Sequence, residues 1–181
     1  WSFFVSWMPK YLLKVQHVDY AHSEWMTALP MLCGGVASLI GGWLSDKIAA
    51  RLGRRRFARA VFPVVGSIIA GAAIFSLQFA DTPMKAVTLM CVTMGAYDFG
   101  LGAKWAAIID VGGAHAALAA GFVNMLGNLG GNSLQPVVGA ALFTHFGWGT
   151  LFVAYAVTYL LSAMMWVFIQ PDTHFYREDR A

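Results

Sequence analysis

Apolar residues run in long blocks along this chain, and the charged residues gather in the short stretches between them. Five blocks reach the roughly 20 residues that a helix needs to cross a hydrocarbon core of about 30 Å. They cover approximately residues 25–45, 60–80, 84–109, 116–143 and 148–170, and a shorter block covers 1–16. The pattern predicts an all-α membrane protein with six transmembrane helices, of which the first is truncated.

Composition supports lipid as the solvent for these blocks. Hydrophobic residues make up 59% of the chain and charged residues 12%, about half the charge of a soluble domain. The connections between blocks are short, so no loop is long enough to fold as a separate water-soluble domain. We expect one transmembrane bundle over residues 1–171, followed by a short tail over 172–181.

The charge distribution orients the predicted bundle. Six Lys or Arg residues fall within residues 46–59, and the positive-inside rule places this loop in the cytoplasm. Counting alternate crossings then puts both chain ends in the cytoplasm, together with Arg177 and Arg180. The net charge of +3 is therefore a topological signal, and we expect no nucleic-acid partner.

The residues that usually carry metal or catalytic chemistry are dispersed. Cys33 and Cys91 lie inside apolar blocks without a CxxC pair, and the five histidines are scattered through or beside loops. Neither arrangement has the spacing of a metal site. Packing is the simplest role for both cysteines, and we expect no metal, no cofactor and no enzymatic activity.

One acid and one base interrupt the block at 84–109. Asp98 and Lys104 each cost about 2.5–3.5 kcal/mol at the centre of a spanning helix, so both are functional candidates. Six residues of ideal helix separate them by about 120° and ~9 Å, which disfavours a direct pair, while Tyr97 shares the face of Lys104. Lys104 is either a buried cation near mid-depth or a side chain that snorkels toward the cytoplasmic interface.

Amide side chains form a stripe on the next block. Asn124, Asn128 and Asn132 recur every four residues, and Gln135 follows one turn later, so all four project from one side of a helix. A stripe facing lipid would be costly, so these amides face other helices or a wet cavity. We favour cavity lining for Asn124 and Asn128, and leave interhelical hydrogen bonding equally open for Asn132 and Gln135.

Three segments carry a resemblance to a known family. Residues Gly42-Trp43-Leu44-Ser45-Asp46-Lys47, with Arg51 and Gly53-Arg54-Arg55-Arg56 after them, resemble the loop signature of the major facilitator superfamily. Their longer spacing after Asp46 is similar to the second, carboxy-terminal copy of that signature. Segments 7–12 and 121–131 resemble the seventh and eleventh helices of its anion:cation symporter family, which handles sugar acids and other organic anions.

The resemblance implies a fold and a function. The six helices would be helices 7–12 of a twelve-helix transporter, and an amino-terminal six-helix bundle would be the missing partner. The protein would be a multi-pass membrane protein, expected in the bacterial inner (plasma) membrane. It would move organic anions such as sugar acids by proton-coupled symport and alternating access. The alternatives are a facilitator-type transporter of a neutral sugar or drug and a non-transporting membrane scaffold.

Residue roles follow from both lines of reasoning. The family motifs place a substrate-contacting aromatic at Trp105 and a substrate-contacting amide at Asn124. With the polar positions above, we expect a substrate site made of Lys104, Trp105, Asn124, Asn128 and Tyr97, with Asp98 in a proton or polar network.

A second group of residues is expected to control conformation rather than to bind substrate. Asp46 ends its helix, where a carboxylate can pair with arginines or with a helix amino terminus. A topology signal alone is the other interpretation of this charge run. The predicted latch consists of Gly42, Asp46, Lys47, Arg51, Arg54 and Arg55.

Overall fold

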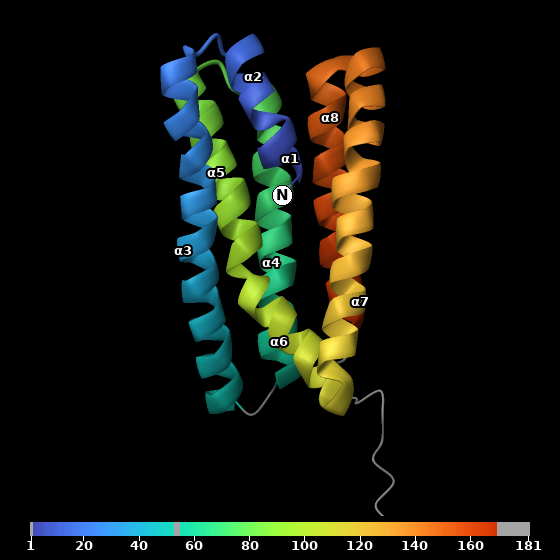
Figure 1. The fold of residues 1–181 in the computed structure, drawn as a ribbon. Helices are drawn as coiled ribbons and strands as arrows, with labels where there is room; N and C mark the ends of the chain where they lie inside the picture. Colours follow the sequence, from blue (N-terminus) through green and yellow to red (C-terminus); the bar gives the residue numbers. More distant parts are fainter. Residues whose placement is uncertain (1, 53–54, 170–181) are drawn as a thin grey trace, which may run out of the picture.

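The computed structural model describes residues 2–52 and 55–169, and every regular element in those ranges is a helix (Figure 1). Three continuous stretches are long and apolar enough to cross a membrane, at 23–51, 59–79 and 83–168. The third covers two of the expected spans completely and most of the span expected at 148–170. The prediction of an all-α integral membrane protein is confirmed, and the tail at 172–181 lies outside the described residues.

The first expected helix is broken into two short pieces. Helix α1 (Ser2–Ser6) and helix α2 (Met8–Lys14) are separated at Trp7, whose φ and ψ are −110° and −31°. Pro9 lies in the first turn of α2 and has no N–H to donate to the preceding turn. The backbone bonds from Trp7 N to Phe3 O and from Tyr11 N to Trp7 O continue around the break, at 2.8 and 2.9 Å.

The middle of the chain forms three long rods. Helices α3 (Tyr20–Leu52) and α4 (Arg55–Ser76) are followed by a 3-10 turn, η1 (Leu77–Phe79). Helix α5 (Pro83–Phe99) begins where the hydroxyl of Thr82 accepts a hydrogen bond from Lys85 N at 3.3 Å, and helix α6 (Leu101–Gly112) continues it. Gly100 separates α5 from α6 and lies against the backbone of Pro63 in α4.

The last third of the chain reverses direction twice at glycines. After the 3-10 turn η2 (Gly113–His115) come helix α7 (Ala116–Asn128), a π-helical segment η3 (Leu129–Leu134) and helix α8 (Gln135–Phe168). Gly113 and Gly147 have φ values of 51° and 79°, a region that glycine enters without steric cost. Gly147 divides α8 into two arms that run side by side in opposite directions (Figure 1).

Glycines set the close approach of α5 to its neighbours. A Cβ on Gly41 of α3 would collide with the carbonyl of Phe99, and one on Gly66 of α4 with the carbonyl of Ala96. A Cβ on Gly102 would lie 2.5 Å from the Cα of Gly42. Such small-residue contacts are how membrane helices pack, because lipid leaves little hydrophobic force between them.

Aromatic side chains hold one end of the bundle together. Trp7 and Tyr11 pack on the ring of Trp148 at centroid distances of 6.0 and 5.2 Å, and Phe3 packs on Phe152 at 6.0 Å. Each such pair contributes about 0.5–1.5 kcal/mol beyond its burial. The cluster joins the short α1–α2 pair to the second arm of α8.

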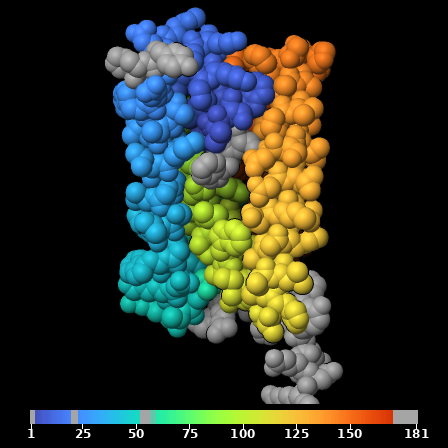
Figure 2. All heavy atoms as spheres, viewed as in Figure 1, coloured from blue at the N-terminus to red at the C-terminus, as the bar shows by residue number. Residues whose placement is uncertain are grey.

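One side of the bundle is open. Every residue from 121 to 130 is exposed, including the large apolar side chains of Phe122 and Met125. In Figure 2 the surface of α5 and α6 lies between those of α3 and α7, with α1 and α2 above it. This open face brings together parts of four of the expected spans.

Candidate functional site

Asp98 lies near the middle of the α5–α6 rod and is almost completely buried. Its exposed fraction is 5%, and a Cβ on Gly34 of α3 would be 2.5 Å from its Oδ2. Within the described part of the chain, its buried Oδ1 has no hydrogen-bond partner. A carboxyl group in this position is costly unless it gains a proton or a partner.

The side chain of Lys104 extends back toward α5, away from the end of the bundle that carries the basic residues 47–59. Its Nζ donates to the carbonyl of Tyr97 at 3.3 Å and lies 3.3 Å from the centroid of the Tyr97 ring. Only 8% of Lys104 is exposed. The structure thus places the amino group of Lys104 in a buried position, back along the rod toward α5, and the side chain does not extend toward the end of α6.

Tyr97 and Lys104 form an interior group. The Tyr97 ring packs edge-to-face on Tyr159 in the second arm of α8, with centroids 5.2 Å apart. Asp98 and Lys104 are both described and make no ion pair within 4.0 Å of each other. This agrees with the rotation of about 120° expected between the two residues on an ideal helix. The break at Gly100 does not bring their side chains into contact.

Trp105 and the asparagines are exposed rather than interior. Trp105 has an exposed fraction of 39%. Asn128 donates to Asn124 O at 2.8 Å and to Asn124 Oδ1 at 3.2 Å, and Asn132 donates to Asn128 Oδ1 at 2.7 Å. The structure therefore brings the asparagines together as a ladder of amides, and it leaves Lys104 and Tyr97 in a separate, buried group.

Gln135 takes a different partner from the ladder. Its Nε2 donates to the hydroxyl of Tyr155 across the two arms of α8. Of the two interpretations left open for Gln135, interhelical hydrogen bonding is the one present. For Asn132 the hydrogen bond to Asn128 lies within its own helical stripe.

A charged cluster joins three helices near the ends of α3 and α6. The expectation that Asp46 ends its helix is wrong, because α3 continues to Leu52. Arg59 of α4 contacts Asp46 of α3 at 2.6 Å and Asp110 of α6 at 3.2 Å. Its Nη1 also donates to Ser45 Oγ at 3.1 Å. Arg59 is mostly buried, Asp110 half-buried and Asp46 exposed, so one guanidinium bridges two carboxylates of unequal exposure.

The other predicted latch residues surround this cluster or lie outside the described residues. Gly42 packs on Gly102, Lys47 lies 4.3 Å from the Trp43 ring centroid, and Arg51 is exposed. Arg54 lies outside the described residues, as does the side chain of Arg55.

Sequence reasoning missed Arg59 and Asp110, which form this cluster with Asp46. It counted Arg59 only as one charge in a basic run, and it did not consider Asp110. The available signal was position, because Asp46 directly follows the expected span at 25–45 and Asp110 directly follows the expected span at 84–109.

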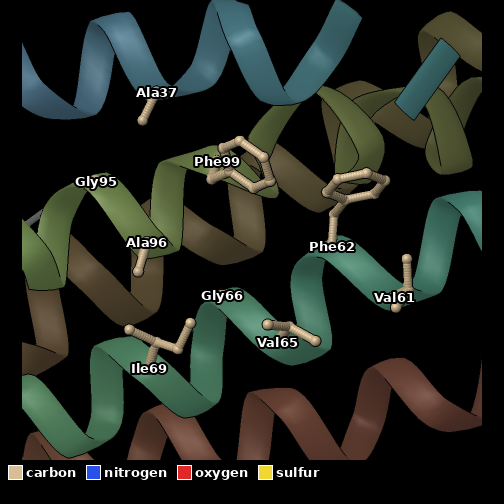
Figure 3. A pocket seen from close by; sticks show the side chains of 9 residues that line it. All are labelled: Ala37, Val61, Phe62, Val65, Gly66, Ile69, Gly95, Ala96 and Phe99. Atoms are coloured by element: carbon tan, nitrogen blue, oxygen red, sulfur yellow. The ribbon is translucent and has the colours of Figure 1, made fainter. Parts of the chain in front are cut away.

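An apolar cavity of about 430 Å³ lies between α3, α4 and α5 (Figure 3). Its lining includes Ala37, Phe62, Ile69 and Phe99. It presents no charged side chain, so it is unsuited to an anionic ligand. The polar positions of the open face are the better candidate site.

The fold and the site define a helical membrane bundle with an open, amide-bearing face and buried polar groups inside its long rods. The model of the Major Facilitator Superfamily matches residues 1–180, and the chain belongs to this family.

Its curated relatives are named as carriers of organic anions. A protein named as a probable sulfoacetate transporter of Cupriavidus necator is 31% identical over 81% of this chain and 34% of its own length. The D-galactonate transporter of Escherichia coli is 25% identical over 94% and 39%. A probable galactarate/D-glucarate transporter of Bacillus subtilis is 26% identical over 91% and 37%. This chain spans little more than a third of the length of these relatives.

Proposed function

We propose that this chain is the carboxy-terminal six-helix half of a secondary transporter that moves organic anions such as sugar acids. The names of the relatives support the substrate class. The observation that carries the proposal is the open face, where Trp105 and the amide ladder are exposed. Membrane helices do not present amides to lipid without cost, so this face suits a wet path between two bundles.

The proposed partner is an amino-terminal six-helix bundle of the same protein. Its surface would cover α3, α5, α6 and α7 and would close the path alternately on each side. In this arrangement residues 1–171 are helices 7–12, and both chain ends face the cytoplasm of a bacterial inner membrane. The basic residues at 47–59 support that orientation.

In the proposed site, some side chains contact the substrate directly and one buried side chain supplies charge. Trp105 supplies an aromatic wall, and Asn124 and Asn128 hydrogen-bond to hydroxyl groups of the substrate. Lys104, held by Tyr97, supplies positive charge that favours a carboxylate in a weakly screened interior. Asp98 holds a proton or joins a polar network, which couples transport to protons.

The latch belongs to the same proposal. Arg59 holds α4 to α3 and α6 through Asp46 and Asp110. The proposed latch also includes the residues expected from the sequence, Gly42, Lys47, Arg51, Arg54 and Arg55. Because Asp46 is exposed, it is free to exchange Arg59 for a group on the partner bundle as the transporter changes state.

Uptake by the full-length protein in proteoliposomes tests the site. Lys104→Gln should lower the rate of D-galactonate uptake at least about tenfold, since one charge-assisted contact is worth roughly 1.5–3 kcal/mol. Trp105→Ala and Asn124→Ala should raise the half-saturating concentration. Trp25→Ala, an exposed tryptophan of α3, is the matched control. Three variants that transport like the parent would refute the site assignment, and a parent that takes up no organic anion would refute the function.

A further inference from the structure

Two interruptions of regular helix meet beside Gly139 in α8. Helices α1 and α2 are separated at Trp7, and the π-helical segment η3 ends immediately before Gln135. A Cβ on Gly139 would lie 3.0 Å from Nε2 of Gln135 and 3.3 Å from Nε1 of Trp7. Both polar side chains therefore lie against one point, at a junction of discontinuous helices of the kind that builds binding sites in transporters.

Each of these side chains carries a buried polar atom without a partner. Among the residues that the structure describes, the indole Nε1 of Trp7 and the Oε1 of Gln135 have no hydrogen-bond partner, and Trp7 is only 5% exposed. Such atoms are nearly always satisfied in folded proteins. One N–H donor and one carbonyl acceptor together match a hydroxyl group, which accepts one hydrogen bond and donates another.

Neighbouring side chains hold both groups in place. The Trp7 ring packs on Phe143 at 5.5 Å and on Trp148 at 6.0 Å between centroids. The Gln135 amide is anchored by its hydrogen bond to Tyr155. A ligand that binds this pair therefore has few side chains left to order, and this small loss of side-chain entropy favours binding.

A cation borders the same place. The Nζ of Lys10 lies 5.1 Å from the centroid of the Trp7 ring, and Lys10 itself is exposed. A ligand that carries both a hydroxyl and a negative charge would meet a partner for each. Gln135 lies eleven residues beyond Asn124, or about 16 Å along the helix, so this place is separate from the level of Asn124.

We propose that Trp7 and Gln135, which both lie against Gly139, form a second subsite that binds a hydroxyl group of the transported organic anion. Lys10 attracts the anion to it. The subsite rests on the proposed function, and it lies on the path between the level of Asn124 and the end of the bundle that holds the α1–α2 pair. A bridging water offers the same hydroxyl chemistry, and the test below separates the two sources.

Competition between two anions tests this subsite in the full-length protein. D-Galactonate carries hydroxyl groups and sulfoacetate carries none, so their inhibition constants against uptake of labelled D-galactonate are compared. Gln135→Leu and Gly139→Ala should weaken D-galactonate about tenfold, the loss expected for a hydrogen bond left unmade, and should leave sulfoacetate unchanged. Lys10→Gln should weaken both anions.

The controls separate a ligand contact from a structural role. Thr144→Val removes an exposed hydroxyl of α8 that bonds only locally to Ala140 O at 2.7 Å, and it should change neither constant. Equal losses for both anions would indicate a structural water or a packing role, and would overturn the subsite. Unchanged constants in both Gln135→Leu and Gly139→Ala would also overturn it. A parent protein that binds neither anion would instead refute the transport function on which the subsite rests.

Discussion

At the scale of single residues, Asp98 carries a buried carboxyl group near the middle of the α5–α6 rod. It packs on Gly34, and its Oδ1 has no partner among the described residues. Several hydrogen-bond donors would keep a carboxyl group ionised, because they favour its charged form. A carboxyl group that takes up and releases a proton therefore needs few such donors.

Asp98→Asn should therefore separate proton coupling from substrate binding. If Asp98 carries the proton, uptake of D-galactonate by the parent should rise as the external pH falls, because protons then drive the substrate inward. The Asn variant should show a flat pH profile with a similar half-saturating concentration. Uptake at a series of external pH values measures this, and a variant that keeps the slope of the parent would remove Asp98 from the coupling path.

The chemistry at this scale was readable from the sequence, but the directions of the side chains were not. Asp98, Lys104 and the asparagines stand out because polar groups are rare in apolar blocks. Whether Lys104 points to the membrane centre or to its surface depends on a cation–π contact with Tyr97 and on the break at Gly100. Spacing along an ideal helix contains neither piece of information.

At the scale of helices, close backbone contacts decide how α5 is placed. Gly41 and Gly66 stand where a side chain would strike the carbonyls of Phe99 and Ala96. Backbone atoms cannot yield as a flexible side chain can, so α5 would have to move as a whole.

Gly41→Ala and Gly66→Ala should each destabilise the protein by about 1–3 kcal/mol, the usual cost of overpacking. The matched control is Gly35→Ala, where nothing lies within 4 Å and alanine is the better helix former. Thermal unfolding of the detergent-solubilised full-length protein should show a clear drop for the first two and none for the third. A drop of equal size in all three would mean that the contacts with α5 are not the cause.

The existence of the helices followed from block length, yet their continuity did not. The span expected at 84–109 is two helices that meet at Gly100, and the block at 116–143 contains a π-helical segment. A glycine fits a straight helix, a kink or a close contact equally well. The choice between them is made by neighbours such as Pro63, which are distant in the sequence.

At the scale of the whole molecule, Arg59 connects three rods through Asp46 and Asp110 at 2.6 and 3.2 Å. The fold class and the basic end were predictable because they depend on composition and on the charge bias of loops. The identity of the bridging arginine required the packing of α4 against both α3 and α6, which no local pattern encodes.

Arg59→Gln should slow transport without changing substrate preference, because it loosens the junction of three helices but leaves the open face intact. We expect the maximal rate to fall about fivefold, equivalent to roughly 1 kcal/mol for a partly exposed charge network. The half-saturating concentration should stay the same. Lys85→Gln, which breaks an exposed pair with Asp81 at 3.0 Å, is the control. A shift in preference among sugar acids would contradict a latch.

The glycine contacts also determine how this chain is free to vary through evolution. Positions 41 and 66 are constrained by carbonyls within the chain itself, so related sequences should keep glycine there whatever substrate they carry. A Cβ added at Gly121, Gly127 or Gly130 would have no atom within 4 Å in the described structure. Packing within this chain therefore does not require glycine at these positions. If related sequences nevertheless preserve glycine at these three sites, the constraint must come from another backbone that approaches the open face, and the pattern of substitutions would trace its outline.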